Sequence, residues 1–231
     1  MTLQSKIAAA VTLLEHIQDE HSPATLASSL GAEDMILTDL VARHAPSISI
    51  FTLDTGRLNP ETYDLLAKVQ ALYNPKLAQP IEIYYPQAEA IEAYVCTHGI
   101  NAFYESIELR KGCCGIRKVE PLKRALFGKQ AWITGLRRQQ SGARTNLAEQ
   151  EWDEGHDLTK FNPLIEWSET EVWEYVRTHE VPYNALHDKH YPSIGCAPCT
   201  RAITLGEDVR AGRWWWENEA TKECGLHVKK V

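Results

Sequence analysis

The 231-residue sequence lacks any apolar run that approaches the roughly 18 residues of a membrane-spanning helix. It also lacks a basic excess, because 24 Lys and Arg residues are outnumbered by 31 Asp and Glu residues, giving a formal net charge of −7. This balance argues against a general nucleic-acid-binding protein, although local basic clusters can still bind a small anion. Repeats and low-complexity segments are absent too, so we expect a globular protein with no nucleic-acid or membrane partner.

The N-terminal segment lacks the features of a secretory signal. Residues 7–14 are apolar, but acidic residues follow them and there is no small-residue cleavage site. An amphipathic helix is predicted instead by apolar residues at helical spacing, namely Leu3, Ile7, Val11, Leu14 and Ile17. We therefore expect a cytoplasmic protein. In a reducing cytosol, the six cysteines are more typical of metal ligands or redox groups than of disulfides.

Short apolar runs alternate with helical patterns over the first two thirds of the chain. The runs predict strands at 24–30, 48–54, 81–86 and 131–137. The helical patterns predict helices at 35–44, from Pro60 onward, at 87–98, at 116–126 and at 168–180, the last with a capping box from Ser168 to Glu171. Strands separated by helices imply a parallel sheet with right-handed crossovers. We predict an α/β fold with a doubly wound, mostly parallel sheet and an irregular C-terminal segment.

Four cysteines form two close pairs, Cys113 with Cys114 and Cys196 with Cys199. A disulfide within the adjacent pair is disfavoured, because neighbouring Cα atoms lie about 3.8 Å apart and disulfides usually need at least about 4.4 Å. Four thiolates can instead bind a tetrahedral zinc ion or an iron–sulfur cluster. Adjacent cysteines suit different corners of a cluster, whereas zinc more often uses two separated pairs. The spacing alone leaves both alternatives open.

The two remaining cysteines differ in their surroundings. Cys224 lies in "KECGLH" near the C-terminus, between Lys222 and His227. Those neighbours favour the reactive thiolate, and a mobile tail could deliver it to a substrate, although a free cysteine near a terminus is usually incidental. Cys96 falls on the helical pattern at 87–98, and we interpret it as a packing residue.

Polar segments at predicted strand ends favour an anionic ligand. "SSLGAEDM" at 28–35 opens a helix, where backbone N–H groups and the helix dipole attract anions, and "LDTGRL" at 53–58 follows the second strand. Either segment alone is also compatible with an ordinary capped turn. Arginines recur beside such segments, namely Arg137, Arg138, Arg144, Arg210 and Arg213. In an acidic protein they favour a phosphate-like substrate, while each one singly is as readily a solvated surface residue.

Seven motifs in order, "SSLGAED", "LDTGRL", "KGCCGIRK", "WITGLRR", "IGCAPCTR", "GRWWWE" and "KECGLH", resemble those of the adenylyl-sulfate and phosphoadenylyl-sulfate reductase family. The resemblance covers nearly the whole chain and implies an adenine nucleotide alpha hydrolase-like fold, related to ATP pyrophosphatases. Members of this family that use phosphoadenylyl sulfate generally lack the paired cysteines. Members that use adenylyl sulfate carry both pairs and bind a 4Fe–4S cluster. Because this chain has both pairs, the resemblance implies the adenylyl-sulfate branch.

The resemblance also implies roles for individual residues. One 4Fe–4S cluster per chain would be held by Cys113, Cys114, Cys196 and Cys199. The catalytic residues would be the nucleophile Cys224, together with Lys118, which would link cluster and substrate electrostatically, and His227. The phosphosulfate would be bound by Arg144, Arg210, Arg213 and His227, and the nucleotide by Ser29, Gly31, Leu53, Thr55 and Gly135. Residues 1–205 would form the α/β nucleotide- and cluster-binding domain, and 206–231 a mobile C-terminal segment with the catalytic cysteine.

The expected activity is therefore reduction of adenylyl sulfate to sulfite and AMP in assimilatory sulfate reduction. It would proceed through a cysteine S-sulfonate that thioredoxin resolves. A phosphoadenylyl-sulfate reductase or a dual-substrate enzyme is the nearest alternative, and a non-catalytic zinc-binding interaction module is a remote one. An ATP-dependent relative is disfavoured, because "SSLGAED" does not match the S-G-G-x-D-S loop of those enzymes. The sequence does not fix the oligomeric state, and a homo-oligomer stays open.

Overall fold

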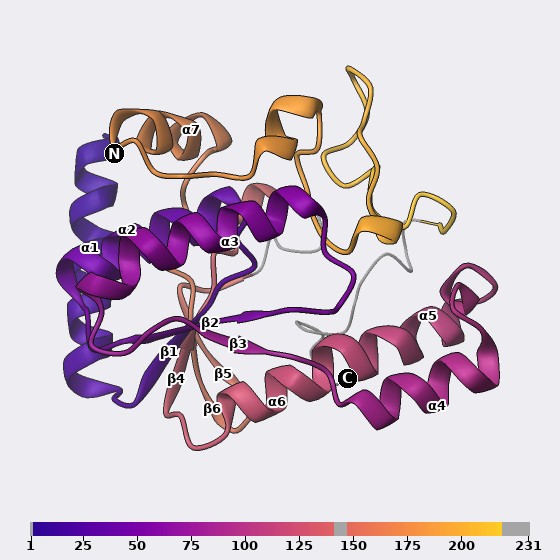
Figure 1. Cartoon of the computed structure of the whole chain (residues 1–231). Coiled ribbons are helices and arrows are strands. Elements are labelled where there is room, and N and C mark those ends of the chain that lie inside the picture. Colours follow the sequence, from indigo (N-terminus) through magenta and orange to yellow (C-terminus); the bar gives the residue numbers. More distant parts are fainter. Residues whose placement is uncertain (1, 141–146, 219–231) are drawn as a thin grey trace. The chain divides into compact units, whose positions relative to one another are not determined.

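The computed structural model describes residues 2–140 and 147–218 (Figure 1). The chain divides into two compact units, which are described here one at a time. The first comprises Met1–Thr52, Pro60–Glu82 and Gly128–Ala185, and the second comprises Leu53–Asn59, Ile83–Phe127 and Leu186–Val231. The expected boundary between residues 205 and 206 stays a prediction, because much of the C-terminal segment lies outside the described residues.

The first unit carries most of the strands and four helices. In chain order they are α1 (Leu3–Glu20), β1 (Ala24–Ala27), α2 (Ala32–His44), β2 (Ser49–Leu53), α3 (Pro60–Tyr73), β4 (Ala131–Ile133), β5 (Gln150–Asp153), β6 (Leu158–Phe161) and α7 (Glu169–Thr178). β2 ends, and β3 (Glu82–Tyr84) begins, where the chain passes between the units. The described part of this unit also contains short 3-10 helices at Asn74–Lys76 and Arg138–Gln140.

The strands form a six-stranded sheet in the order β3-β2-β1-β4-β6-β5. β1 pairs in parallel with both β2 and β4, and β4 pairs in parallel with β6. β2 and β3 thus lie on one side of β1 in the sheet, and the later strands β4, β5 and β6 lie on the other side. The predicted doubly wound, mostly parallel α/β fold is confirmed. The antiparallel pair of β5 and β6, in which Gln150 faces Phe161, was not predicted, because β5 is polar and exposed or half-exposed and β6 carries a charged lysine at a buried position.

Two strand ends differ from the sequence-based prediction. β1 ends at Ala27 instead of continuing to residue 30, because Leu30 adopts a left-handed backbone conformation with φ of 62° that no strand can contain. The chain therefore turns early, and α2 begins at Ala32, ahead of the predicted residue 35. β4 ends at Ile133 rather than at residue 137. Both changes leave short loops after the strands at the carboxyl edge of the sheet.

A buried carboxylate lies within the helices of the first unit. Asp39 on α2 is 2% exposed and accepts hydrogen bonds from the hydroxyls of Tyr73 at 3.2 Å and Tyr175 at 2.9 Å. Arg43, one turn later, forms an ion pair with the same carboxylate at 2.9 Å. A buried charge is tolerated when it is paired and hydrogen-bonded in this way. Burial and the Asp39 charge together raise the pKa of both tyrosines, so each remains a hydrogen-bond donor.

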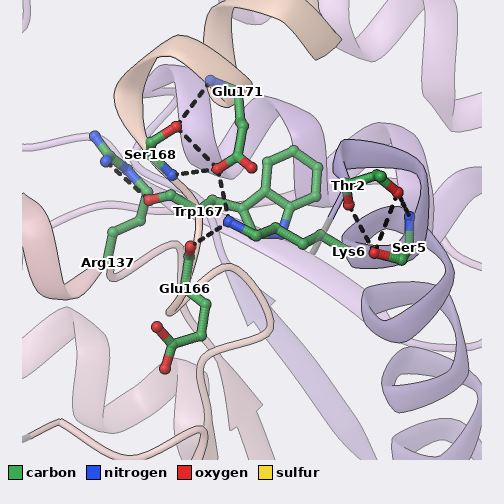
Figure 2. Close-up of polar contacts among 8 residues, drawn as sticks. All are labelled: Thr2, Ser5, Lys6, Arg137, Glu166, Trp167, Ser168 and Glu171. Atoms are coloured by element: carbon green, nitrogen blue, oxygen red, sulfur yellow. Dashed lines mark hydrogen bonds and ion pairs between the residues drawn. The ribbon is translucent and has the colours of Figure 1, made fainter.

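The N-terminal helix is bound to the start of α7, as Figure 2 shows. The predicted capping box is confirmed: the Ser168 hydroxyl accepts from the N–H of Glu171, and the Glu171 carboxylate accepts from the N–H of Ser168. The ammonium group of Lys6 on α1 donates to the same carboxylate at 2.8 Å and to the carbonyl of Glu166 at 2.7 Å. The first turn of α7 and the first turn of α1 therefore share one acidic side chain.

The second unit is mainly helical. It contains α4 (Ala88–His98), α5 (Ile107–Cys114), a π-helical turn (Gly115–Val119), α6 (Glu120–Leu126) and short 3-10 helices at Ala102–Tyr104 and Ala197–Cys199. A further 3-10 helix, Ala185–Lys189, starts at the last residue of the first unit. Helical structure thus begins before the cysteine pair, at Ile107, and not after it as predicted. The interpretation of Cys96 as a packing residue is wrong, because its side chain on α4 is exposed.

Candidate functional site

The four paired cysteines line one cavity within the second unit. Its volume is about 370 Å³, including space open to solvent, and Lys118 lines it as well. All four cysteines are free thiols; Cys113 is half-buried, and Cys114, Cys196 and Cys199 are buried. The structure thus brings together five residues that the sequence assigned to a common site from two distant segments.

Local structure explains the placement of the adjacent pair. Ser106 caps α5 by accepting a hydrogen bond from the N–H of Leu109, and Cys113 and Cys114 occupy the last turn of that helix. The chain then widens into the π-helical turn, a feature that is frequent at functional sites. Arg117 on this turn is buried and donates to the carbonyl of Thr55 at 2.6 Å. Both cysteines therefore sit on a helix that is fixed at its start and just beyond its end.

The second pair is held by the loop that follows β2. Cys196 and Cys199 lie at either end of the 3-10 helix, and the N–H of Ala197 donates to the carbonyl of Arg57 at 2.8 Å. The Thr55 hydroxyl lies 3.2 Å from Cys196 Sγ, within hydrogen-bond distance of the sulfur. The "LDTGRL" segment therefore orients the Cys-x-x-Cys segment directly, a structural role that sequence reasoning did not assign to it.

The thiols of the cavity differ in their acidity. Burial raises the pKa of Cys113, and it raises the pKa of Cys199 to about 12, with help from the neighbouring Cys196. Burial also acts to raise the pKa of Cys196, but the positive charge of Lys118 and the Thr55 hydroxyl outweigh it, so this pKa is lowered. Buried thiols of this kind bind as thiolates only when a cation compensates their charge, which a metal centre does.

Two of the arginines predicted to bind the substrate, Arg213 and Arg210, lie in the described part of the second unit. Arg213 is 8% exposed, and its guanidinium lies over the ring of Trp214, 4.6 Å from the ring centroid. A side chain at Gly195 would overlap this guanidinium, so the glycine permits the close approach. Arg213 and Lys118 both act to lower the pKa of Cys196, which places two predicted catalytic or substrate-binding cations beside the cysteines. Arg210, three residues earlier, is half-buried, and its N–H donates to Asp208 at 2.7 Å.

The predicted nucleotide loops of the first unit are arranged around Asp34. The N–H and hydroxyl of Ser29 donate to its carboxylate at 2.7 and 2.6 Å, and the N–H of Gly135 donates to it at 3.1 Å. A side chain at Gly135 would overlap Asp34, so only glycine fits there. Gly31 is the N-cap of α2. These donors, which we expected to meet an external anion, are thus occupied by a carboxylate of the chain itself.

Two arginines that were candidates for anion binding have other partners. Arg137 donates to Glu33 at 2.7 Å and to the carbonyl of Trp167 at 3.2 Å, and Arg138 forms a close ion pair with Glu166. Both therefore serve the packing of the first unit. Of the remaining predicted residues, Leu53 ends β2 and Thr55 is 2% exposed. The other three predicted site residues, Arg144, Cys224 and His227, lie outside the described residues.

The chain also has known relatives. Residues 23–202 match the model of the phosphoadenosine phosphosulfate reductase domain. The chain belongs to this family. The adenosine 5'-phosphosulfate reductase of Allochromatium vinosum is 55% identical over 229 residues, covering 99% of this chain and 88% of that protein. The enzyme of the same name from Burkholderia cepacia is 51% identical, covering 99% and 90%. The resemblance inferred from the motifs is confirmed.

Solved structures support the same family. The phosphoadenylyl-sulfate reductase of Candida auris, in a phosphate complex, has a TM-score of 0.68 at 28% identity and covers 88% of this chain and 91% of its own. The NH3-dependent NAD synthetase of Campylobacter jejuni has a TM-score of 0.56 at 12% identity, a likeness of fold alone that covers 82% and 78%. The predicted adenine nucleotide alpha hydrolase-like fold is confirmed. No helix of the described residues is long and apolar enough to cross a membrane.

The sequence analysis missed several residues that line the cysteine cavity or join the strand-end loops. Arg57, Arg110 and Arg117 line the cysteine cavity, and none of the three was predicted. A signal existed for Arg110, because it precedes Cys114 by four positions and so shares a helix face with it. Asp34 carried only the weak signal of an acidic residue in the first turn of a helix.

Proposed function

We propose that this protein reduces adenylyl sulfate to sulfite and AMP in assimilatory sulfate reduction. The observation that carries the proposal is the convergence of both cysteine pairs and Lys118 on one cavity. Adenylyl sulfate is supported as the substrate by two relatives that share about half of their residues with this chain. Both are named adenosine 5'-phosphosulfate reductase. We also propose that the protein acts in the cytoplasm and takes electrons from thioredoxin.

The residues of the cavity fit a 4Fe–4S cluster. The donor set is four free thiols, and the indole Nε1 of Trp214, in the same cavity wall, is buried and has no hydrogen-bond partner among the described residues. Cluster sulfurs accept such hydrogen bonds. Tetrahedral zinc with bonds of about 2.3 Å requires its sulfurs to lie about 3.8 Å apart. Among residues 2–140 and 147–218, no three His, Cys, Asp or Glu side chains are grouped to hold a single ion. Analysis for iron and inorganic sulfide separates a cluster from zinc.

We assign Cys113, Cys114, Cys196 and Cys199 as the ligands. When bound, the cluster would supply a fixed charge distribution and would link the two segments that carry the cysteines, with no change of its oxidation state required. The basic side chains nearby would then act on the substrate. We propose that Lys118 and Arg213, whose charges favour the thiolate of Cys196, would attract the anionic phosphosulfate as well.

The proposed nucleophile is Cys224. Its thiolate attacks the sulfur of adenylyl sulfate; a bond forms between Cys224 Sγ and that sulfur, and the sulfur–oxygen bond to the phosphate breaks. AMP leaves with the bonding electron pair, and Cys224 becomes an S-sulfonate. Because the thiolate and the substrate are both anionic, the reaction requires cations. Lys118, His227 and three arginines would supply them, namely Arg144, Arg210 and Arg213.

Thioredoxin would complete the cycle as the two-electron donor. One of its thiolates attacks Cys224 Sγ, and sulfite leaves with the electrons of the sulfur–sulfur bond. Its second thiol then resolves the mixed disulfide, which restores the Cys224 thiol and yields oxidised thioredoxin. The nucleotide contacts that we propose are Ser29, Gly31, Leu53, Thr55 and Gly135. We propose further that Cys224, within the expected C-terminal segment 206–231, must move between these two steps to expose the S-sulfonate.

A second candidate is a phosphoadenylyl-sulfate or dual-substrate reductase, which the likeness to the Candida auris enzyme favours. The two functions are separated by sulfite release from each nucleotide, measured with anaerobically purified protein and reduced thioredoxin. We expect adenylyl sulfate to be the better substrate by a large factor in kcat/KM. Equal or greater turnover of phosphoadenylyl sulfate would assign the second function, and no sulfite from either nucleotide would exclude both.

A further inference from the structure

A deeply buried ion pair joins the cysteine cavity to the end of the described chain. Arg110 Nε lies 2.7 Å from Glu217 Oε1, and Arg110 Nη2 lies 2.8 Å from Glu217 Oε2. The two side chains are 0% and 4% exposed, the deepest burial of any ion pair in the described part of the chain. The two parallel hydrogen bonds fix the orientation of both groups as well as their distance.

Both partners are tied to the predicted cluster site. Arg110 lies on α5, lines the cysteine cavity, and its guanidinium lies 4.8 Å from the centroid of the Trp214 ring. The N–H of Glu217 donates to the carbonyl of Trp214 at 2.9 Å, which closes a tight turn. Trp216, inside this turn, packs edge-on against Tyr104 with ring centroids 4.5 Å apart. Residues 214–217 are therefore held at three points within the second unit.

A purely stabilising role does not require charged residues here. A buried ion pair is often no more stable than well-packed apolar side chains of similar volume, because both ions lose their hydration. What such a pair provides, and apolar contacts do not, is one defined geometry. The position of Glu217 in the chain indicates why a defined geometry would matter, since it lies seven residues before Cys224.

We propose that Arg110 and Glu217 are positioning residues that fix the point from which the C-terminal residues extend toward the substrate. The proposal rests on the function proposed above, with Cys224 as the nucleophile. Seven residues span at most about 25 Å, so fixing Glu217 beside the cavity confines the reactive thiol to its surroundings. The pair thereby raises the effective concentration of the thiol at the bound substrate.

Removing the pair could slow the reaction of Cys224 in two ways, by lengthening its tether or by removing a defined orientation, and the two differ in size. If Glu217 were released, the nearest residues still held by packing would be Trp216 and Trp214, eight and ten positions before Cys224. Lengthening a tether from seven to ten residues lowers the contact probability only about twofold, because it scales as the −3/2 power of length. Loss of a defined orientation costs far more. We therefore expect removal of the pair to slow the first chemical step at least fivefold.

The test measures S-sulfonate formation in a single turnover. Anaerobically purified, iron-loaded protein is mixed with adenylyl sulfate without any thiol donor, quenched at intervals, and the adduct on the C-terminal peptide is measured by mass spectrometry. Glu217→Gln should form the adduct at least fivefold more slowly, with unchanged AMP affinity and iron content. The matched control is Glu207→Gln, which removes a half-buried two-point pair with Arg201 in the same unit and should react at the wild-type rate.

A second variant covers the case in which Glu217→Gln fails to fold or to hold iron. Arg110→Met combined with Glu217→Leu replaces the pair by apolar side chains and should keep the wild-type Tm and iron content, yet should still be slowed at least fivefold. A rate within twofold of wild type in either variant of the Arg110–Glu217 pair, once that variant is folded and iron-loaded, would overturn the proposal. Absence of the adduct in the wild-type protein would instead refute the proposed function, and this inference with it.

Discussion

The Ser29 hydroxyl lies 2.6 Å from the Asp34 carboxylate, which also accepts the N–H of the same serine at 2.7 Å. Gly135 donates to the other carboxylate oxygen, so one acidic residue joins the loops that follow β1 and β4. Burial raises the pKa of this carboxyl from 3.8 to about 6. The predicted nucleotide loops of the first unit are thus organised around a group that titrates within an accessible pH range.

The raised pKa of Asp34 predicts a pH dependence of stability. The folded protein holds the proton more tightly than the unfolded chain, so this carboxyl favours folding below about pH 4 and loses that contribution as pH rises to about 6. A shift of about two units corresponds to at most about 3 kcal/mol. The difference in unfolding free energy between wild type and Asp34→Asn, measured by urea denaturation, should change in this window. Parallel profiles from pH 4 to 7 would show that Asp34 does not titrate as described.

The cluster assignment predicts a selective loss of iron. Cys196→Ala removes a buried sulfur from the cavity and should abolish both bound iron and inorganic sulfide in anaerobically purified protein. Cys96→Ala is the matched control, because this cysteine belongs to the same unit but is exposed on α4. It should retain the wild-type colour, iron and sulfide. Full metal content in Cys196→Ala would exclude that residue as a ligand, and zinc without sulfide in the wild type would exclude the cluster.

The contact between α1 and α7 predicts acid sensitivity. Burial acts to raise the pKa of Glu171, but the Lys6 ammonium and the two Ser168 donors outweigh it and lower the pKa from 4.5 to about 2. This carboxylate therefore stabilises the fold above about pH 4.5, and the contribution is lost as pH falls toward 2. Lys6→Met should unfold at a higher pH than wild type when followed by circular dichroism. Lys68→Met, which changes an exposed lysine on α3, should match wild type, and identical acid transitions in all three proteins would contradict the assignment.

Much of the fold followed from the sequence, and the exceptions have physical causes. Apolar runs located β1, β2 and β4, because strands buried on both faces need continuous hydrophobic residues. An apolar run also located β3, although this edge strand is exposed or half-buried. The hairpin of β5 and β6 escaped detection because polar residues support it: Lys160 forms an ion pair with Glu151 at 3.2 Å across the two strands. The end of β1 depended on the left-handed backbone of Leu30, which no propensity scale indicates for leucine.

The candidate site was predictable where the residue type is rare and paired. Four cysteines in two close pairs indicated a shared partner, and the structure places them around one cavity. Arg110 was not predictable in the same way, because a lone arginine most often lies at the surface, and only tertiary structure brings Glu217 to it. The reverse error occurred for Arg137, which the sequence presented as an anion ligand and which pairs with Glu33 instead.

The most direct test of the central claim is mass spectrometry of anaerobically purified protein mixed with adenylyl sulfate in the absence of a thiol donor. If Cys224 is the nucleophile, we expect one sulfonate per chain on the peptide that contains it, one equivalent of AMP, and sulfite release once reduced thioredoxin is added. Cys224→Ser should yield neither adduct nor AMP while it retains iron and sulfide. Sulfite formation without an adduct on Cys224, or normal turnover by Cys224→Ser, would contradict the role of Cys224 as the nucleophile.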